Sequence, residues 1–548
     1  MTRDSGGKGS PAWKGPGNTT VSLVVAILLL VGVPLVPRAL VDDASAPLVG
    51  LPAESIIVVA LLCLIPSRGV RGVAAAAFGV VIVTAVVLAG IGAGYRSVLD
   101  IPFDPLDWQQ LGDAFGVVQS SIGGTAATGL LVLLVVVAVG AIVALSWAAL
   151  RTAAAVRTRV HGTALISTVT AVWLLAAVTG SHIVPGQPAA AAASAREITA
   201  SVSRAAEGLA AVADLSQRIA TDPYRDTPGS ELLTSLAGKD VVFAFIESYG
   251  KVAVDDESGL SAGVQQVLRD GEAQLRADGY ASQSAFLTSP TFGGVSWLAH
   301  STFQTGLWVD RQPLYNKVIR SDRLTLSDAF GAAGWRTVSV IPSNTEPWSF
   351  GSSFYHWETM LDANNVGYRG PRFGYARIPD QYTWKHFADH ELAGDQPVMA
   401  EIDLVSSHTP WAPLPKLVPW AEVGDGSVFR PQPAQGQSAT EVWQDPERVR
   451  EAYARSIQYS LGAMFAFLHN SDDPNLVLVV LGDHQPATIV SGHGASHDVP
   501  ISIISKDPAV FESISGWRWQ EGMLPATDAP VWPMSAFRDR FLDAFSAG

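Results

Sequence analysis

Long apolar runs without charged residues fill the first third of the chain, and shorter apolar runs between polar segments follow from about residue 186. A helix needs roughly 20 consecutive apolar residues to cross a bilayer. Several runs approach this length. They predict five membrane spans at about Thr20–Val36, Leu48–Pro66, Gly72–Gly94, Gly129–Leu150 and Thr163–Val184.

The rest of the chain alternates between strand-like and helix-like patterns. The Ala-rich segment Ala189–Asp222 has helical spacing and predicts a juxtamembrane amphipathic helix. From about Tyr224, the alternation is typical of an α/β domain with a largely parallel central sheet. The expected strands are Val241–Ile246, Thr337–Ile341, Val398–Leu404, Leu476–Leu481 and Ile501–Ile504, and the expected helices are Gly263–Asp278, Thr325–Ala333 and Arg448–Ser471.

Charge divides the chain at the same place. Residues 1–190 hold ten Lys and Arg and eight Asp and Glu, which leaves 26 and 42 of the totals of 36 and 50 for the remainder. The formal net charge of −14 argues against a nucleic-acid partner, because nucleic-acid affinity depends on cations that contact phosphates. The single cysteine, Cys63, excludes an intrachain disulfide framework and any CxxC motif.

The distribution of Lys and Arg predicts the orientation, since cytoplasmic loops carry an excess of these residues. The tail and the second and fourth loops hold Arg3, Lys8, Lys14, Arg68, Arg71, Arg151, Arg157 and Arg159, whereas the first and third loops hold one Arg each beside Asp42, Asp43, Asp100, Asp104, Asp107 and Asp113. We therefore expect a cytoplasmic tail at 1–19, a five-span transmembrane domain at 20–185, a juxtamembrane helix or linker at 186–224 and an extracytoplasmic catalytic domain at 225–548.

A transporter is the main alternative for the membrane part. Transporters place ionisable or helix-breaking residues at mid-membrane depth. The interiors of the predicted spans are almost uniformly Ala, Val, Leu and Ile, which favours an anchor with, at most, a lipid-access surface.

Polar side chains follow three of the predicted buried strands. Glu247 follows the first strand, Asp483 and His484 follow "LVLVVLG", and His408 comes shortly after "MAEIDL". In open α/β sheets, ligands bind in the crevice beyond the carboxyl ends of the strands. Two carboxylates and an imidazole that meet there could hold a divalent cation.

A candidate nucleophile lies in "TSPTFGGVSWLAH", residues 288–300. Gly293 and Gly294 allow a tight turn before Ser296, and a helix that starts there could bind a phosphate group at its N-terminus. A serine hydroxyl bound to a metal ion loses its proton more readily and becomes a nucleophile. The alternative for Ser296 is an ordinary helix N-cap.

Together, a strand that ends at Glu247, a hydroxyl residue after a Gly-rich turn and the late "GDH" at 482–484 resemble the alkaline phosphatase/sulfatase superfamily. The resemblance is greatest to its membrane branch, the lipoteichoic acid synthases and phosphoethanolamine transferases, which have five spans followed by an external sulfatase-like domain. It implies that Glu247, Ser296, Asp483 and His484 bind one divalent cation, with Mn expected and Mg or Zn as alternatives. It also implies that Ser296 is the covalent nucleophile and that His408 faces the transferred phosphoryl group.

The substrate-binding candidates are Trp348, His408, His493 and His497, and the sequence departs from the family around one of them. Glycerol-phosphate polymerases have Trp-x-Arg, but here Phe350 stands two residues after Trp348. Losing a guanidinium removes bidentate phosphate contact, so that specificity does not transfer. The membrane transferases generally have Thr where Ser296 stands, and sulfatases need a C/S-x-P/A-x-R stretch that Ser296 does not begin.

The resemblance implies a transferase that moves a phosphoglycerol- or phosphoethanolamine-type head group from a membrane phospholipid to an extracellular glycan or glycolipid. Ser296 would carry the phospho-intermediate. Two alternatives remain open: a phosphodiesterase or sulfuric-ester hydrolase of the same superfamily, and a catalytically silent scaffold that binds envelope polymer.

Overall fold

The computed structural model describes residues 16–41, 49–112, 115–116, 119, 123–184, 187–256, 258–394 and 396–547. Several predicted features lie outside these residues: the tail at 1–15, Leu48 at a span end, the boundary residues 185 and 186, and Asp42, Asp43 and Asp113. The chain forms two compact units. The first comprises Met1–Arg96 and Ile101–Glu207, and the second comprises Ser97–Asp100 and Gly208–Gly548.

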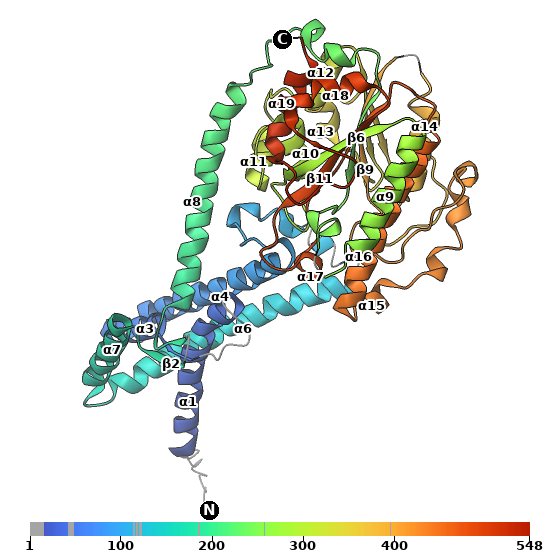
Figure 1. Ribbon diagram of the computed structural model, residues 1–548. Coiled ribbons are helices and arrows are strands. Elements are labelled where there is room, and N and C mark those ends of the chain that lie inside the picture. The colour runs from blue at the N-terminus through green and yellow to red at the C-terminus, as the bar shows by residue number, and fades with distance from the viewer. Residues whose placement is uncertain are drawn as a thin grey trace, which may run out of the picture. The chain divides into compact units, whose positions relative to one another are not determined.

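The first unit is helical (Figure 1). Its helices are α1 (Pro16–Gly32), α2 (Val36–Val41), α3 (Ala53–Leu64), α4 (Arg68–Leu99), α6 (Gly124–Arg157), α7 (Gly162–Thr179) and the start of α8 (Ala193–Ala220). Short strands pair within it: β1 (Leu51–Pro52) with β4 (Ala190–Ala191), and β2 (His182–Val184) with β3 (Gln187–Pro188). The helix α8 lies within the segment Ala189–Asp222 that was predicted to be helical; its position beside the membrane stays a prediction.

The prediction of five spans is wrong by one. Within the described residues, four helices are long and apolar enough to cross a membrane: Thr19–Val41, Arg68–Leu99, Gly124–Arg157 and Gly162–Thr179. The second predicted span, Leu48–Pro66, contains only the 12-residue α3. Two prolines limit this helix: Pro52 precedes it with an extended backbone, and Ile65, extended before Pro66, ends it.

The second unit contains a nine-stranded sheet in the order β12-β6-β11-β10-β5-β9-β7-β8, with β13 also paired to β6. Strands β10, β5, β9, β7 and β8 run parallel, as predicted, whereas β11 is antiparallel to both β10 and β6. The strands are β5 (Val241–Ile246), β6 (Ala281–Thr288), β7 (Arg336–Ile341), β8 (Thr359–Asp362), β9 (Val398–Leu404), β10 (Val477–Gly482), β11 (Asp498–Ser505), β12 (Gln520–Glu521) and β13 (Val531–Pro533).

The sheet is therefore mixed and not simply parallel. A parallel neighbour needs a crossover of a dozen or more residues, usually a helix. Residues 483–497 between β10 and β11 are numerous enough for a crossover, but the helix that they form, α17 (Thr488–Ser491), has only four residues, and the following strand returns in the opposite direction.

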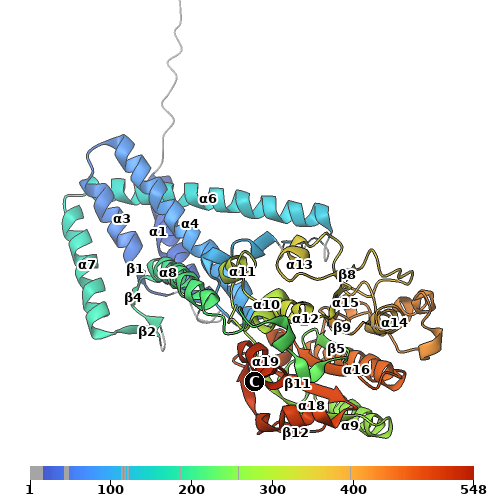
Figure 2. The same cartoon turned by 90° about the horizontal axis from the view of Figure 1, so that it is seen from above.

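Helices cover both faces of this sheet. Val242, Ala244 and Ile246 of β5 face a core shared with α9 and α16, which lie side by side in Figure 1 and Figure 2. Phe243 and Phe245 face a second core with α10, α12 and α19. The helices are α9 (Ala262–Ala277), α10 (Ser296–Thr305), α11 (Gln312–Val318), α12 (Leu326–Ala332), α13 (Ser349–Ser353), α14 (Asp380–His390), α15 (Ala439–Val442), α16 (Pro446–His469), α18 (Pro508–Ser513) and α19 (Phe537–Phe545).

Candidate active site

Parallel pairing brings the predicted strand ends together. Ile246 at the end of β5 pairs with Gly482 of β10 on one side and with Leu404 of β9 on the other. Glu247 and Asp483 therefore follow adjacent strands at the same edge. The backbone N–H of Ser248 donates to Asp483 Oδ1 over 2.7 Å, which ties the two strand ends to each other.

A strained turn presents Ser296 to these residues. Gly293 has φ +69° and Val295 has φ +59°, a left-handed conformation that is an outlier for a β-branched residue. The helix α10 then starts at Ser296. The Ser296 hydroxyl donates to Glu247 Oε2 over 3.2 Å and lies 3.2 Å from His484 Nε2. The N-cap position belongs to Val295, so the alternative of an ordinary N-cap serine is wrong.

The side chain of His484 is oriented as a metal ligand would be. Its Nδ1 lies 2.8 Å from the Gln485 carbonyl oxygen, so in the neutral ring the proton is on Nδ1 and the Nε2 lone pair is free. That lone pair lies 3.4 Å from oxygens of both Glu247 and Asp483. Three electron-rich atoms that face one another repel unless a cation lies among them. In metal sites, a backbone carbonyl commonly accepts the N–H of the second ring nitrogen of a ligating histidine, as Gln485 does here. The residues fit a divalent cation.

The charges at the centre are coupled. Burial and the negative charge of Glu247 raise the pKa of Asp483 above its usual range. Burial also opposes ionisation of Glu247, but the electrostatic interactions with His408 and His484 and the hydrogen bond from Ser248 outweigh it and lower its pKa. One carboxylate thus stays ionised while its neighbour resists ionisation, which is the pattern of two acids that share a site. A bound cation would relieve this repulsion.

The other predicted site residues lie in different surroundings. His408 stacks on Tyr375, with ring centroids 3.6 Å apart, and its Nδ1 lies 2.6 Å from the Thr409 carbonyl oxygen. His497 packs on Phe292 of the turn before Ser296, and His493 Nδ1 lies 2.9 Å from Asp100 Oδ1. Trp348 packs on Tyr355, with ring centroids 5.3 Å apart, beside the core that contains α10. Its role in substrate binding stays a prediction.

A second polar cluster escaped the sequence analysis. His300 Nδ1 lies 3.0 Å from Glu401 Oε1 and 3.6 Å from Asp403 Oδ1. Its members come from α10 and β9, about a hundred residues apart. One signal was present: Glu401 and Asp403 occupy alternate positions of an otherwise apolar strand and therefore face the same side of the sheet.

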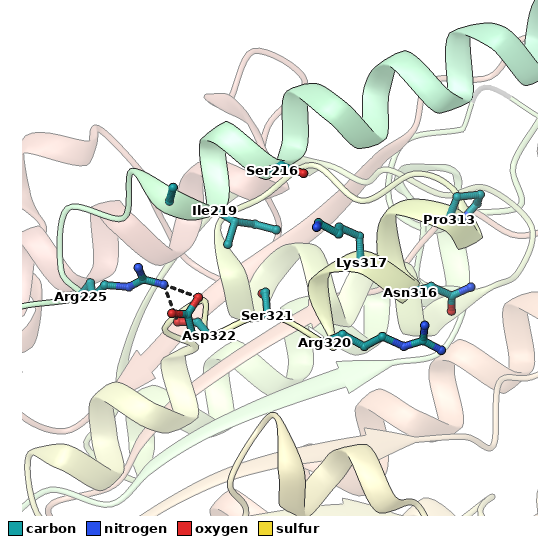
Figure 3. Close-up of a pocket in the computed structure, with 10 residues that line it drawn as sticks. Ser216, Ile219, Arg225, Pro313, Asn316, Lys317, Arg320, Ser321 and Asp322 are labelled. Carbon is teal, nitrogen blue, oxygen red and sulfur yellow. Dashed lines mark hydrogen bonds and ion pairs between the residues drawn. The ribbon is translucent and has the colours of Figure 1, made fainter.

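A cavity of about 680 Å³ lies elsewhere on the second unit, between the end of α8 and α11 (Figure 3). Arg225, Lys317 and Arg320 border it, and Arg225 pairs with Asp322. None of the predicted site residues lines this cavity. The candidate active site is therefore the cluster at the strand ends.

Comparisons with known proteins find similarity only at the level of structure. No family model and no curated protein matches the chain. Among solved structures, the lipooligosaccharide phosphoethanolamine transferase A of Neisseria meningitidis matches with a TM-score of 0.46 and 12% identity, covering 96% of this chain and 94% of that one. The phosphoglycerol transferase GacH of Streptococcus pyogenes matches with a TM-score of 0.35 and 14% identity, covering 62% and 91%. The lipoteichoic acid synthase LtaP of Listeria monocytogenes matches with a TM-score of 0.35 and 11% identity, covering 57% and 74%. These matches are likenesses of structure alone, since each is below 25% identical.

Proposed function

We propose that this chain is a membrane-anchored, metal-dependent transferase that moves a phosphate-containing lipid head group to a cell-envelope acceptor. One observation supports the proposal above the others. A serine hydroxyl at a helix N-terminus lies 3.2 Å from both a carboxylate and an imidazole, at the edge where central strands end. This arrangement supplies a nucleophile and a cation site at one point.

Four residues would hold the cation: Glu247, Ser296, Asp483 and His484. Mn²⁺ is expected, with Mg²⁺ or Zn²⁺ as alternatives. When bound, the ion lowers the pKa of the serine hydroxyl and offsets negative charge on the phosphoryl oxygens. The chain supplies the rest: Glu247 Oε2 accepts the Ser296 hydroxyl proton in a hydrogen bond, and the N–H groups at the start of α10 are oriented to stabilise an anion.

The reaction consists of two displacements at phosphorus. The Ser296 hydroxyl would give its proton to Glu247 Oε2 as its oxygen bonds to the phosphorus of the lipid phosphodiester. The bond from phosphorus to the diacylglycerol oxygen breaks, and that oxygen takes up a proton. His408 would supply this proton. An acceptor hydroxyl then attacks the phosphoserine and gives its proton to His408. The bond from phosphorus to the Ser296 oxygen breaks, Ser296 recovers its proton from Glu247, and the head-group phosphate stays on the acceptor.

The donor is a membrane phospholipid and the acceptor an extracellular glycan or glycolipid. We place the N-terminus in the cytoplasm and the second unit outside, because Lys and Arg concentrate in the tail and alternate loops. This placement needs an odd number of crossings, so the 12-residue apolar helix α3 would have to enter the membrane in addition to the four long helices. The apolar helices of the first unit would hold the centre at the membrane that contains its donor.

The test uses the full chain in vesicles of phosphatidylglycerol or phosphatidylethanolamine with Mn²⁺. Diacylglycerol should form from one of these lipids, and mass spectrometry should find an adduct on Ser296 whose mass identifies the head group. Ser296→Ala should abolish both signals. Ser301→Ala makes the same change five residues further along α10 and should leave both intact.

Three results would contradict the proposal. Wild-type activity in Ser296→Ala would exclude the nucleophile. Release of the free head-group phosphate at an equal rate with and without glycolipid acceptor would indicate a hydrolase. Absence of bound metal in the purified chain, together with no turnover of either lipid, would favour the scaffold.

A further inference from the structure

The helix that carries Ser296 is short, and its contacts with the sheet determine where the serine oxygen lies. The helix α10 spans ten residues, and His300 and Gln304 follow Ser296 at intervals of four. These three positions therefore lie near one face, about one turn apart. Ser296 contacts the candidate metal centre, whereas the next two positions reach a single carboxylate on β9.

That carboxylate belongs to Glu401 and binds both helix residues. His300 Nδ1 lies 3.0 Å from Oε1, and Gln304 Nε2 donates to Oε2. The amide oxygen of Gln304 in turn accepts the backbone N–H of Ser327 in α12 over 3.1 Å. The second and third turns of α10 are thus attached to the sheet and to a neighbouring helix.

The attachment lies in an apolar layer. Glu401 and Asp403 pair in register with Phe243 and Phe245 of β5, and the ring of Phe245 stacks on His300 with centroids 3.9 Å apart. The side chains of His300 and Glu401 are 14% and 11% exposed. A carboxylate in such surroundings needs a cation or several donors, so these hydrogen bonds are difficult to replace with water.

The cluster is internally satisfied. Although burial disfavours the charged ring, the charges of Asp403 and Glu401 raise the pKa of His300 to about 9. Burial raises the pKa of Asp403 to about 7 against the opposing charge of His300. A protonated His300 balances Glu401 and offers no lone pair at Nδ1. His300 and Glu401 thus form an ion pair, and Asp403 lies beside it.

We propose that His300, Gln304 and Glu401 form a clamp that positions α10, and with it the Ser296 oxygen, at the candidate metal centre. The expected effect of the clamp on catalysis rests on the proposed function, whereas its expected effect on metal binding rests on the geometry alone. Its members are positioning residues, since the clamp acts through Ser296. A displacement of about 1 Å at a reacting atom can lower a rate by a factor of about 100.

Turnover of bis(p-nitrophenyl) phosphate, a simple phosphodiester, by the full chain in detergent with Mn²⁺ supplies the first measurement. His300→Ala should lower kcat by at least about tenfold and leave KM nearly unchanged. His300→Gln keeps an N–H donor and should recover most of the loss. Gln304→Met keeps the shape of the side chain and should also lower kcat, which tests the clamp if His300→Ala does not fold.

Metal affinity supplies a second measurement that needs no turnover. Because Ser296 is a proposed ligand, His300→Ala should weaken Mn²⁺ binding by about tenfold, the low end of the range for residues that orient ligands. The control is Thr302→Val on the same helix, which removes buried hydrogen bonds to Val309 without touching Glu401. It should leave both kcat and Mn²⁺ affinity within about twofold of wild type.

The results separate the clamp from the proposed function. If Ser296→Ala is inactive while His300→Ala and Gln304→Met keep wild-type kcat and Mn²⁺ affinity, the clamp is wrong and the proposed function stands. If Ser296→Ala stays active, the proposed function fails, and a weakened Mn²⁺ affinity in His300→Ala would still support the clamp. Loss of one of two bound metal equivalents in His300→Ala would show that the cluster binds metal and would overturn the clamp.

Discussion

Replacing Asp222 by asparagine should destabilise the second unit more than any exposed charge substitution. The Asp222 carboxylate is fully buried and accepts two hydrogen bonds from Arg538 Nη2 over 2.7 and 2.9 Å. Arg323 Nε lies 3.1 Å from the same carboxylate, and its side chain is 3% exposed. Both guanidinium groups also donate to the Thr305 carbonyl oxygen at the end of α10. Two buried cations therefore share this buried anion, and the partly exposed Asp539 adds a second carboxylate 3.4 Å from Arg538 Nη1.

The expected loss follows from this arrangement. Removing one partner of a buried ion pair leaves an uncompensated charge and costs about 3–5 kcal/mol. Asparagine retains one acceptor oxygen but directs N–H groups at guanidinium donors. Since the total stability of a folded domain is about 5–15 kcal/mol, the substitution removes a large share of it.

Urea unfolding of the full chain in detergent, followed by tryptophan fluorescence, measures this loss. Trp517 lies 6.2 Å from Phe537 of α19, between ring centroids, so its emission reports on the region around Arg538. The matched control is Asp322→Asn. Asp322 also pairs with an arginine, but its side chain is 80% exposed, so the expected change is below about 1 kcal/mol. An equal shift of the two variants would refute the reasoning.

Further predictions concern packing, pH and metal. Gly482→Ala places a Cβ 2.0 Å from the Tyr249 carbonyl oxygen, so it should lower the free energy of unfolding by about 1–3 kcal/mol and weaken Mn²⁺ binding. The control is Gly516→Ala, whose Cβ meets nothing within 4 Å and which should change neither quantity in the same unfolding and titration assays. Burial raises the pKa of Asp380 to about 6, so the folded state holds its proton more tightly and stability falls as pH rises from about 4 to 6. Asp380→Asn should remove that fall, worth up to about 3 kcal/mol, and an unchanged pH profile of unfolding would count against the assignment. Chelation should lower the thermal midpoint and Mn²⁺ should restore it, because the ion binds only the folded centre; a midpoint unaffected by either would exclude a metal there.

Continuous apolar runs were sufficient to locate the central strands. Strands β5 and β10 are buried on both faces, so their pattern carries no polar alternation, and they were predicted within about one residue. Strand β6 was missed because Ser282, Gln283 and Ser284 interrupt its pattern. Ser284 is buried yet satisfied by the Ser502 hydroxyl of β11, which only the folded sheet brings near.

The residues of the candidate site could be predicted from the sequence where a polar side chain directly follows a buried strand. Glu247, Asp483 and His484 mark the ends of apolar runs, and strand pairing brings them into contact. His300 and Glu401 do not follow a strand end, because each lies within a helix or strand. Their contact depends on how α10 packs on β9, which the sequence pattern does not show. The direction of β11 likewise depends on the path of the largely non-helical connection after β10, which an apolar pattern does not describe.

The central location of β5 and β10 determines how heat would inactivate the protein. Each strand has a hydrogen-bonded neighbour on both sides, and their amides should exchange with deuterated solvent only when the whole unit melts. Three of the candidate ligands, Glu247, Asp483 and His484, follow these strands directly, so fraying at the sheet edges leaves them in place. Loss of activity on heating should accordingly coincide with cooperative melting.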